Sequence, residues 1–133
     1  MAYLFVYGSL KRGFKQHDRH MKRARFVAET MTKEPAFKLV AVLDPDTDPP
    51  YAGILDGGAF HVKGELYEVE DKLIARLNTY EGENYTLKEI ALANGSTAGV
   101  YFFTKADIPT TETYPRIRHS QTPAPTAEWL AQA

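Results

Sequence analysis

The stretch Tyr3-Leu4-Phe5-Val6-Tyr7, followed at once by Gly8-Ser9, decides how this chain begins to fold. A short, unbroken run of aromatic and branched residues that closes on a glycine is typical of a strand buried on both faces. The glycine and serine then predict a turn. Such a turn can direct successive backbone N–H groups into one cavity and form an anion-binding nest. The alternative is a plain connection from strand to loop.

The clearest helix is predicted over residues 70–81. Apolar residues recur there at helical spacing and line one face: Leu73, Ile74, Leu77 and Tyr80. The acidic residues Glu70 and Asp71 lie in the first turn, where the helix dipole favours them. Gly82 follows the last turn and is placed to end the helix.

The other elements are mostly strands. Residues 61–69 predict a strand with Gly64 inside it, and a glycine within a strand often marks the close approach of a ligand or another backbone. Residues 86–93 and 97–104 flank Asn94-Gly95, the strongest hairpin signal in the chain. The remaining predictions are strands over 25–34 and 36–43, a short helix around 18–24, a loop over 44–50, and irregular chain around Gly53, Gly57 and Gly58.

Many strands with one long helix predict an α+β fold, most simply a small, partly closed mixed β-sheet or barrel with one long helix and one or two short ones. We expect residues 1–104 to form the domain. Residues 105–133 are expected to be a C-terminal extension, extended or partly packed on that domain, with Trp129 and Leu130 as its anchor.

Composition excludes several classes of function. The 133 residues suit a single domain, and the absence of cysteine excludes disulfides, thiolate catalysis and cysteine-ligated metals. A net charge of -1 disfavours general binding to nucleic acid or anionic membranes. Since the longest apolar run near the start has six residues and a spanning helix needs about 20, we expect no membrane segment. The expectation is a cytoplasmic protein that is a monomer or a weak dimer.

Glu81 is the most informative carboxylate. It falls at the C-terminal end of the predicted helix, where the dipole disfavours a negative charge. Tyr80 and Tyr85 would desolvate it if the site is buried, and both effects raise the pKa of a glutamate toward the value that a general base needs near neutral pH. The alternative is an exposed glutamate at a frayed helix end.

Two other arrangements of polar residues are weaker. His17 and His20 lie one turn apart, but a zinc site needs further ligands, and the other histidines have no telling spacing. Ser9 could be a nucleophile, yet it lacks the G-x-S-x-G elbow. No metal site is predicted.

Several short motifs, in order, carry a resemblance to a known family. Residues 5–13 read FVYGSLKRG, residues 62–67 read VKGELY, residues 77–82 read LNTYEG, and Tyr85 opens the next strand. Together they resemble the γ-glutamylcyclotransferase-like family, and within it the γ-glutamylamine cyclotransferase (AIG2-like) branch. The likeness covers about residues 3–104. Asn78 and Gln16 stand where many members carry Asp and Asn.

The resemblance implies a small-molecule enzyme that uses no cofactor. Its substrate would be an L-γ-glutamyl amide, which cyclises to 5-oxoproline and releases an amine or amino acid. Glu81 would be the catalytic general base and acid. Substrate-binding residues would be the Tyr7-Gly8-Ser9-Leu10 turn, through its backbone N–H groups, together with the pocket-lining Gly64 and Tyr85.

Two other functions stay open on the sequence. A non-catalytic small-molecule binding module of the same fold would keep the Gly8 turn without needing Glu81. A metal-dependent hydrolase would use His17 and His20. Chelators would inactivate only the last of these.

Overall fold

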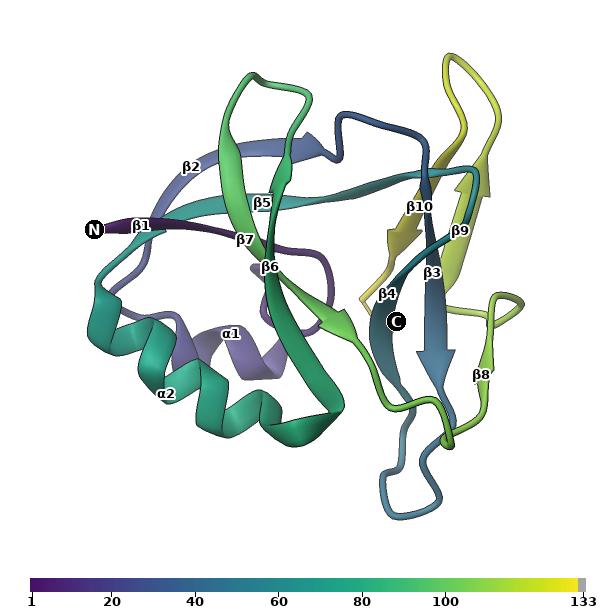
Figure 1. The fold of residues 1–133 in the computed structure, drawn as a ribbon, viewed down its shortest axis with the longest axis horizontal. Helices are drawn as coiled ribbons and strands as arrows, with labels where there is room; N and C mark the ends of the chain where they lie inside the picture. Colours follow the sequence, from purple (N-terminus) through teal and green to yellow (C-terminus); the bar gives the residue numbers. More distant parts are fainter. Residues whose placement is uncertain (132–133) are drawn as a thin grey trace.

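The computed structural model describes residues 1–131 and shows one curled, mixed β-sheet with two α-helices (Figure 1). Its strands are β1 (Ala2–Val6), β2 (Arg25–Met31), β3 (Phe37–Val42), β4 (Tyr51–Asp56), β5 (His61–Val69), β6 (Tyr85–Ala91), β7 (Thr97–Phe103), β8 (Thr110–Thr111), β9 (Ile117–Ser120) and β10 (Thr126–Trp129). The helices are α1 (Lys15–His20) and α2 (Asp71–Glu81), and a 3-10 turn η1 (Gly82–Asn84) follows α2. This half-barrel confirms the expected α+β class.

The sheet runs in the order β8-β3-β4-β7-β1-β5-β10-β9, with β2 paired to β5 and β6 paired to β7. The β1 strand is central: it is antiparallel to β5 and parallel to β7. Leu4 and Val6 of this strand pack in one buried cluster with α2, while Phe5 and Tyr7 pack in a second cluster. The strand is therefore buried on both faces, as its unbroken apolar run predicts.

The α2 helix forms where the apolar periodicity predicts it. Leu73 and Leu77 are buried against β1, and Asp71 lies in the first turn. Gly82 follows with a φ of 69°, a left-handed conformation that glycine adopts without steric cost, and its N–H donates to the Asn78 carbonyl. The helix therefore ends at Glu81, and Tyr85 begins β6 three residues after Gly82.

The predicted strands over residues 61–69 and the hairpin about Asn94-Gly95 are confirmed by β5, β6 and β7. The hairpin register pairs Ala91 with Thr97, and Gly95 at its tip has a φ of 92°. The β2 and β3 strands lie within the two ranges predicted from residue 25 to residue 43.

Two local predictions are wrong. The short helix spans Lys15–His20 rather than residues 18–24, because Met21 is buried and its N–H closes the helix on the His17 carbonyl. Residues 51–56 form β4 rather than irregular chain. Gly53 allows β4 to lie close to β7, since an added Cβ would come within 2.9 Å of the Phe103 Cβ.

The segment after residue 104 adds β8, β9 and β10 to the same sheet. Thr126 of β10 pairs with His61 of β5 in a parallel arrangement, and β9 covers the outer edge of β10. Trp129 is buried in the core and stacks on Tyr114. Across residues 1–131, no helix has the length and apolar character needed to cross a membrane.

Candidate active site

One cavity of about 520 Å³ opens where β1 and α2 both end. Its wall combines the β1 turn, the end of α2, the starts of β4 and β6, and residues from the 44–50 loop and the C-terminal segment. Six of the seven residues predicted for the site line it: Tyr7, Gly8, Ser9, Leu10, Glu81 and Tyr85. The structure thus brings together two chain segments more than 70 residues apart.

The turn after β1 presents free backbone donors. Lys11 N–H donates to the Gly8 carbonyl at 3.0 Å, which closes the turn. Within residues 1–131, the N–H groups of Gly8, Ser9 and Leu10 donate to no protein acceptor. Gly8 itself is required by close packing rather than by an unusual φ, because an added Cβ would lie 2.9 Å from the Ala52 Cβ of β4. An anionic or carbonyl group of a ligand could satisfy these donors.

Glu81 contributes the carboxylate of the cavity. It is the last residue of α2 and is partly buried. Desolvation raises the pKa of its carboxyl to about 7, and no cation or hydrogen-bond donor among the described residues offsets that effect. A carboxyl group with this pKa can both accept and return a proton near neutral pH.

Tyrosines surround this carboxylate. Tyr7, Tyr80 and Tyr85, which the sequence analysis names, line the cavity, and so do two tyrosines for which the sequence carries no signal, Tyr51 and Tyr101. Burial raises the pKa of Tyr7 and Tyr85 above the ordinary value, and the charge of Glu81 raises both further. The phenols therefore stay neutral and form a half-polar wall.

Three of these tyrosine hydroxyls donate hydrogen bonds to acceptors other than the Glu81 carboxylate. Tyr7 donates to the Tyr101 carbonyl at 2.6 Å, and Tyr85 donates to the Ala52 carbonyl at 2.6 Å. Tyr101 donates to Oδ1 of Asn78 at 2.7 Å. These bonds fix the rings.

Gly64 lies elsewhere. It sits in β5 against β1, where an added Cβ would collide with the Val6 carbonyl oxygen. It lines a second, smaller hollow of about 270 Å³ together with Lys11 and Glu65. The close approach of two backbones therefore explains why a glycine occurs inside this strand. The structure does not bring Gly64 into the cavity that holds Glu81.

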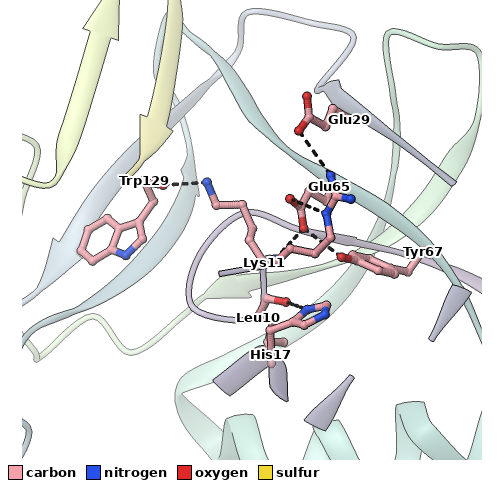
Figure 2. Close-up of polar contacts among 8 residues, drawn as sticks. Leu10, Lys11, His17, Glu29, Glu65, Tyr67 and Trp129 are labelled. Carbon is pink, nitrogen blue, oxygen red and sulfur yellow. Dashed lines mark hydrogen bonds and ion pairs between the residues drawn. The ribbon is translucent and has the colours of Figure 1, made fainter. Parts of the chain in front are cut away.

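The buried carboxylate of Glu65 in β5 holds the chain just after the β1 turn. Oε1 of Glu65 accepts a hydrogen bond from the Arg12 backbone N–H at 2.8 Å and another from the Tyr67 hydroxyl at 2.9 Å (Figure 2). Glu65 is only 8% exposed, and its second oxygen lies 3.5 Å from Nε of Arg12. The residues just after the turn are thereby fixed to β5.

Two further contacts hold the same loop. Lys11 Nζ donates to the Trp129 carbonyl at 2.6 Å, and Nδ1 of His17 lies 2.7 Å from the Leu10 carbonyl oxygen (Figure 2). His17 is therefore engaged with the backbone, and no group of residues suited to a metal ion is found between residues 1 and 131.

The sequence does not predict the other wall residues as part of the site. They come from the 44–50 loop, from α1, from η1 and from the C-terminal segment: Asp44, Thr47, Asp48, Pro49, Pro50, Gln16, Asn84, Arg116 and Trp129. Oε1 of Gln16 is buried without a hydrogen-bond partner among the described residues. Only the folded arrangement shows that these distant segments share one wall.

Comparison with known proteins defines the class of protein. The family described as "Gamma-glutamyl cyclotransferase, AIG2-like" matches residues 4–130, and the chain belongs to this family. The match includes the C-terminal strands as well as the region of the quoted motifs.

Particular relatives agree with this assignment. A protein of Methanocaldococcus jannaschii named "Putative gamma-glutamylcyclotransferase" is 32% identical over 109 residues, which is 77% of this chain and 85% of that protein. The gamma-glutamylaminecyclotransferase of Rattus norvegicus is 36% identical over 86 residues, 62% of this chain and 56% of the rat protein. The match therefore spans about half the length of the rat relative. The crystal structure of an AIG2-like protein from Mus musculus superposes with a TM-score of 0.67 at 25% identity, covering 87% of this chain and 89% of that one.

Proposed function

We propose that the protein is a γ-glutamyl cyclotransferase that converts an L-γ-glutamyl amide to 5-oxoproline and a free amine or amino acid, without a cofactor. The observation that carries the proposal is the position of Glu81. Its partly buried carboxylate, with a pKa near 7, shares one cavity with the free backbone donors of the Gly8 turn.

The reaction needs a proton carrier and a folded substrate. The substrate's α-ammonium gives a proton to the Glu81 carboxylate, and the resulting amine attacks its own γ-carbonyl carbon. The new C–N bond closes the five-membered ring, and the oxyanion that develops can accept hydrogen bonds from the Ser9 and Leu10 N–H groups. Holding the chain folded supplies much of the acceleration, because the attack is intramolecular.

Collapse of the intermediate then breaks the bond to the leaving nitrogen. Glu81 returns its proton to that nitrogen, and the second proton lost by the attacking nitrogen follows by the same route. The three hydrogens of the α-ammonium thus end as one on the lactam nitrogen and two on the leaving amine, which departs as an ammonium ion. Glu81 ends ionised, as it began.

The test is a screen for release of 5-oxoproline from γ-glutamyl amines, γ-glutamyl amino acids and glutathione. Turnover by the wild type, and a loss of about 10²–10⁴-fold in Glu81→Gln, would support the proposal. Binding of 5-oxoproline without turnover of any substrate would instead identify a binding module of the same fold. Unchanged turnover in a folded Glu81→Gln variant would refute the assignment of the base.

A further inference from the structure

Arg116 stands out on the cavity wall because of its charge. Among the described residues it is the only lysine, arginine or histidine that lines the cavity, whose other formal charges come from carboxylates. Glu81 and the backbone turn suffice for the proposed ring closure, so this guanidinium has no role in that step.

The fold fixes the position of Arg116. Its Nε donates to the Leu130 carbonyl at 3.0 Å, and its own carbonyl accepts from the Leu130 N–H at 2.7 Å. The guanidinium carbon lies 4.9 Å from the centre of the Trp129 ring and 5.8 Å from that of Phe14. A cation held by a hydrogen bond and two aromatic rings has lost much of its rotamer freedom before any ligand arrives.

The remaining donors of Arg116 have no protein partner within residues 1–131. A guanidinium carries five N–H donors, and only the Nε–H is used. Its neighbour Arg118 shows the contrast, since that side chain points outward and pairs with Glu128 at 2.6 Å. A half-buried guanidinium without a carboxylate partner is suited to bind a ligand carboxylate, for which its planar donors are well arranged.

The position of Arg116 along the cavity indicates which carboxylate of the substrate it could bind. Arg116 packs beside Phe14 and Trp129 on the part of the wall formed by the C-terminal segment, whereas Glu81 enters the cavity from the end of α2. The substrate's α-amine must reach Glu81, and its α-carboxylate is attached to the same carbon atom. A carboxylate that reaches Arg116 therefore belongs elsewhere on the substrate.

We propose that Arg116 is a specificity-determining residue that binds a carboxylate carried by the leaving group. This inference rests on the proposed cyclotransferase function. The preferred substrates are then γ-glutamyl amides of amino acids rather than of simple amines. Asp44 and Asp48 on another part of the wall repel a carboxylate, which leaves the Arg116 end as the place for one.

The experiment compares acids with their amides. The substrates are γ-glutamyl-glycine, γ-glutamyl-4-aminobutyrate and γ-glutamyl-6-aminohexanoate, each beside the compound in which the leaving-group carboxylate is a carboxamide. All six keep the α-carboxylate. For the chain length that wild type uses best, kcat/KM should favour the acid by about 10- to 100-fold, the range of a charge-assisted hydrogen bond. Arg116→Gln should remove that preference, Arg116→Lys should restore part of it, and Arg118→Gln should leave it unchanged.

Other outcomes overturn the inference. If Arg116→Gln lowers kcat/KM for acid and amide equally, the residue serves the α-carboxylate or the fold; if it changes neither, Arg116 binds no substrate carboxylate. If wild type turns over none of the six compounds, the wider screen decides the proposed function, and calorimetric titration with the same pairs tests Arg116 separately. Tighter binding of the acid by wild type but not by Arg116→Gln would sustain the inference, and equal or absent binding would end it.

Discussion

Replacing Glu81 with glutamine should make stability depend less on pH. A carboxyl whose pKa is raised in the folded state binds its proton more tightly there than in the unfolded chain. The contribution of Glu81 to the stability of the wild-type folded state is therefore largest below pH 4.5, where the carboxyl is protonated in both states. The protein loses that stability as pH rises toward about 7, because the unfolded chain ionises freely and the folded site resists ionisation. Glutamine has no charge to desolvate and removes this dependence.

The magnitude follows from the pKa values. Each tenfold change in proton affinity corresponds to about 1.4 kcal/mol, so a rise from 4.5 to about 7 amounts to about 3 kcal/mol. Because the residue is partly exposed, solvent lowers this figure, and about 1–3 kcal/mol is the expected gain of Glu81→Gln over wild type at pH 8. At pH 4 the two proteins should unfold with similar free energies.

Urea denaturation of both proteins between pH 4 and pH 8 measures the effect. Glu83→Gln is the matched control, since Glu83 is exposed in the turn that follows α2. The same titration should appear in the rate: wild-type kcat/KM should fall about tenfold per pH unit below pH 7, as the base becomes protonated. If Glu81→Gln is no more stable than wild type at pH 8, or if the rate is flat from pH 8 to pH 5, Glu81 is not the desolvated base described here.

Two further substitutions test how the β1 turn is built, and a third tests the cavity wall. Gly8→Ala forces a Cβ to within 2.9 Å of the Ala52 Cβ, so we expect a loss of about 1–3 kcal/mol in urea denaturation and weaker binding of 5-oxoproline by calorimetry; unchanged values would contradict the packing. Glu65→Ala leaves the Arg12 N–H unpaired and should lower the free energy of unfolding by about 2–4 kcal/mol. Glu29→Ala removes only an exposed partner of Arg12 and should lower it by less than about 1 kcal/mol. Equal losses in the two variants would show that Glu65 does not anchor the turn. Arg116→Gln should abolish the preference for acidic leaving groups, with the controls given above.

The elements that could be predicted from sequence are those with a local cause. The apolar run of residues 3–7, the helical spacing of Leu73 and Leu77, and the Asn94-Gly95 turn each specify a structure within a few residues. Glu81 could be singled out for a similar reason, because its place at a helix end between two tyrosines is visible in the chain itself.

The features that were missed depend on distant contacts. The β4 strand contains Gly53, which disfavours a strand locally, yet its close packing against Phe103 of β7 makes glycine the residue that fits. Sequence alone predicts Gly64 as a pocket residue because a ligand and a neighbouring backbone both require the absence of a side chain. Arg116 gave no signal, since its place beside Trp129 depends on how the C-terminal strands join the sheet.

The site also explains why five tyrosines fail to stabilise the charge of Glu81. A phenol hydroxyl that donated to this carboxylate would favour its ionised form and lower its pKa. The hydroxyls of Tyr7 and Tyr85 instead donate to backbone carbonyls, and that of Tyr101 donates to the Asn78 side chain. The rings therefore exclude water from Glu81 without replacing its hydrogen bonds, which is the condition under which burial raises the pKa of a carboxyl to about 7. The polar contacts of these tyrosines thus fix the wall and leave the Glu81 carboxylate without a hydrogen-bond donor from residues 1–131, as the proposed role in proton transfer requires.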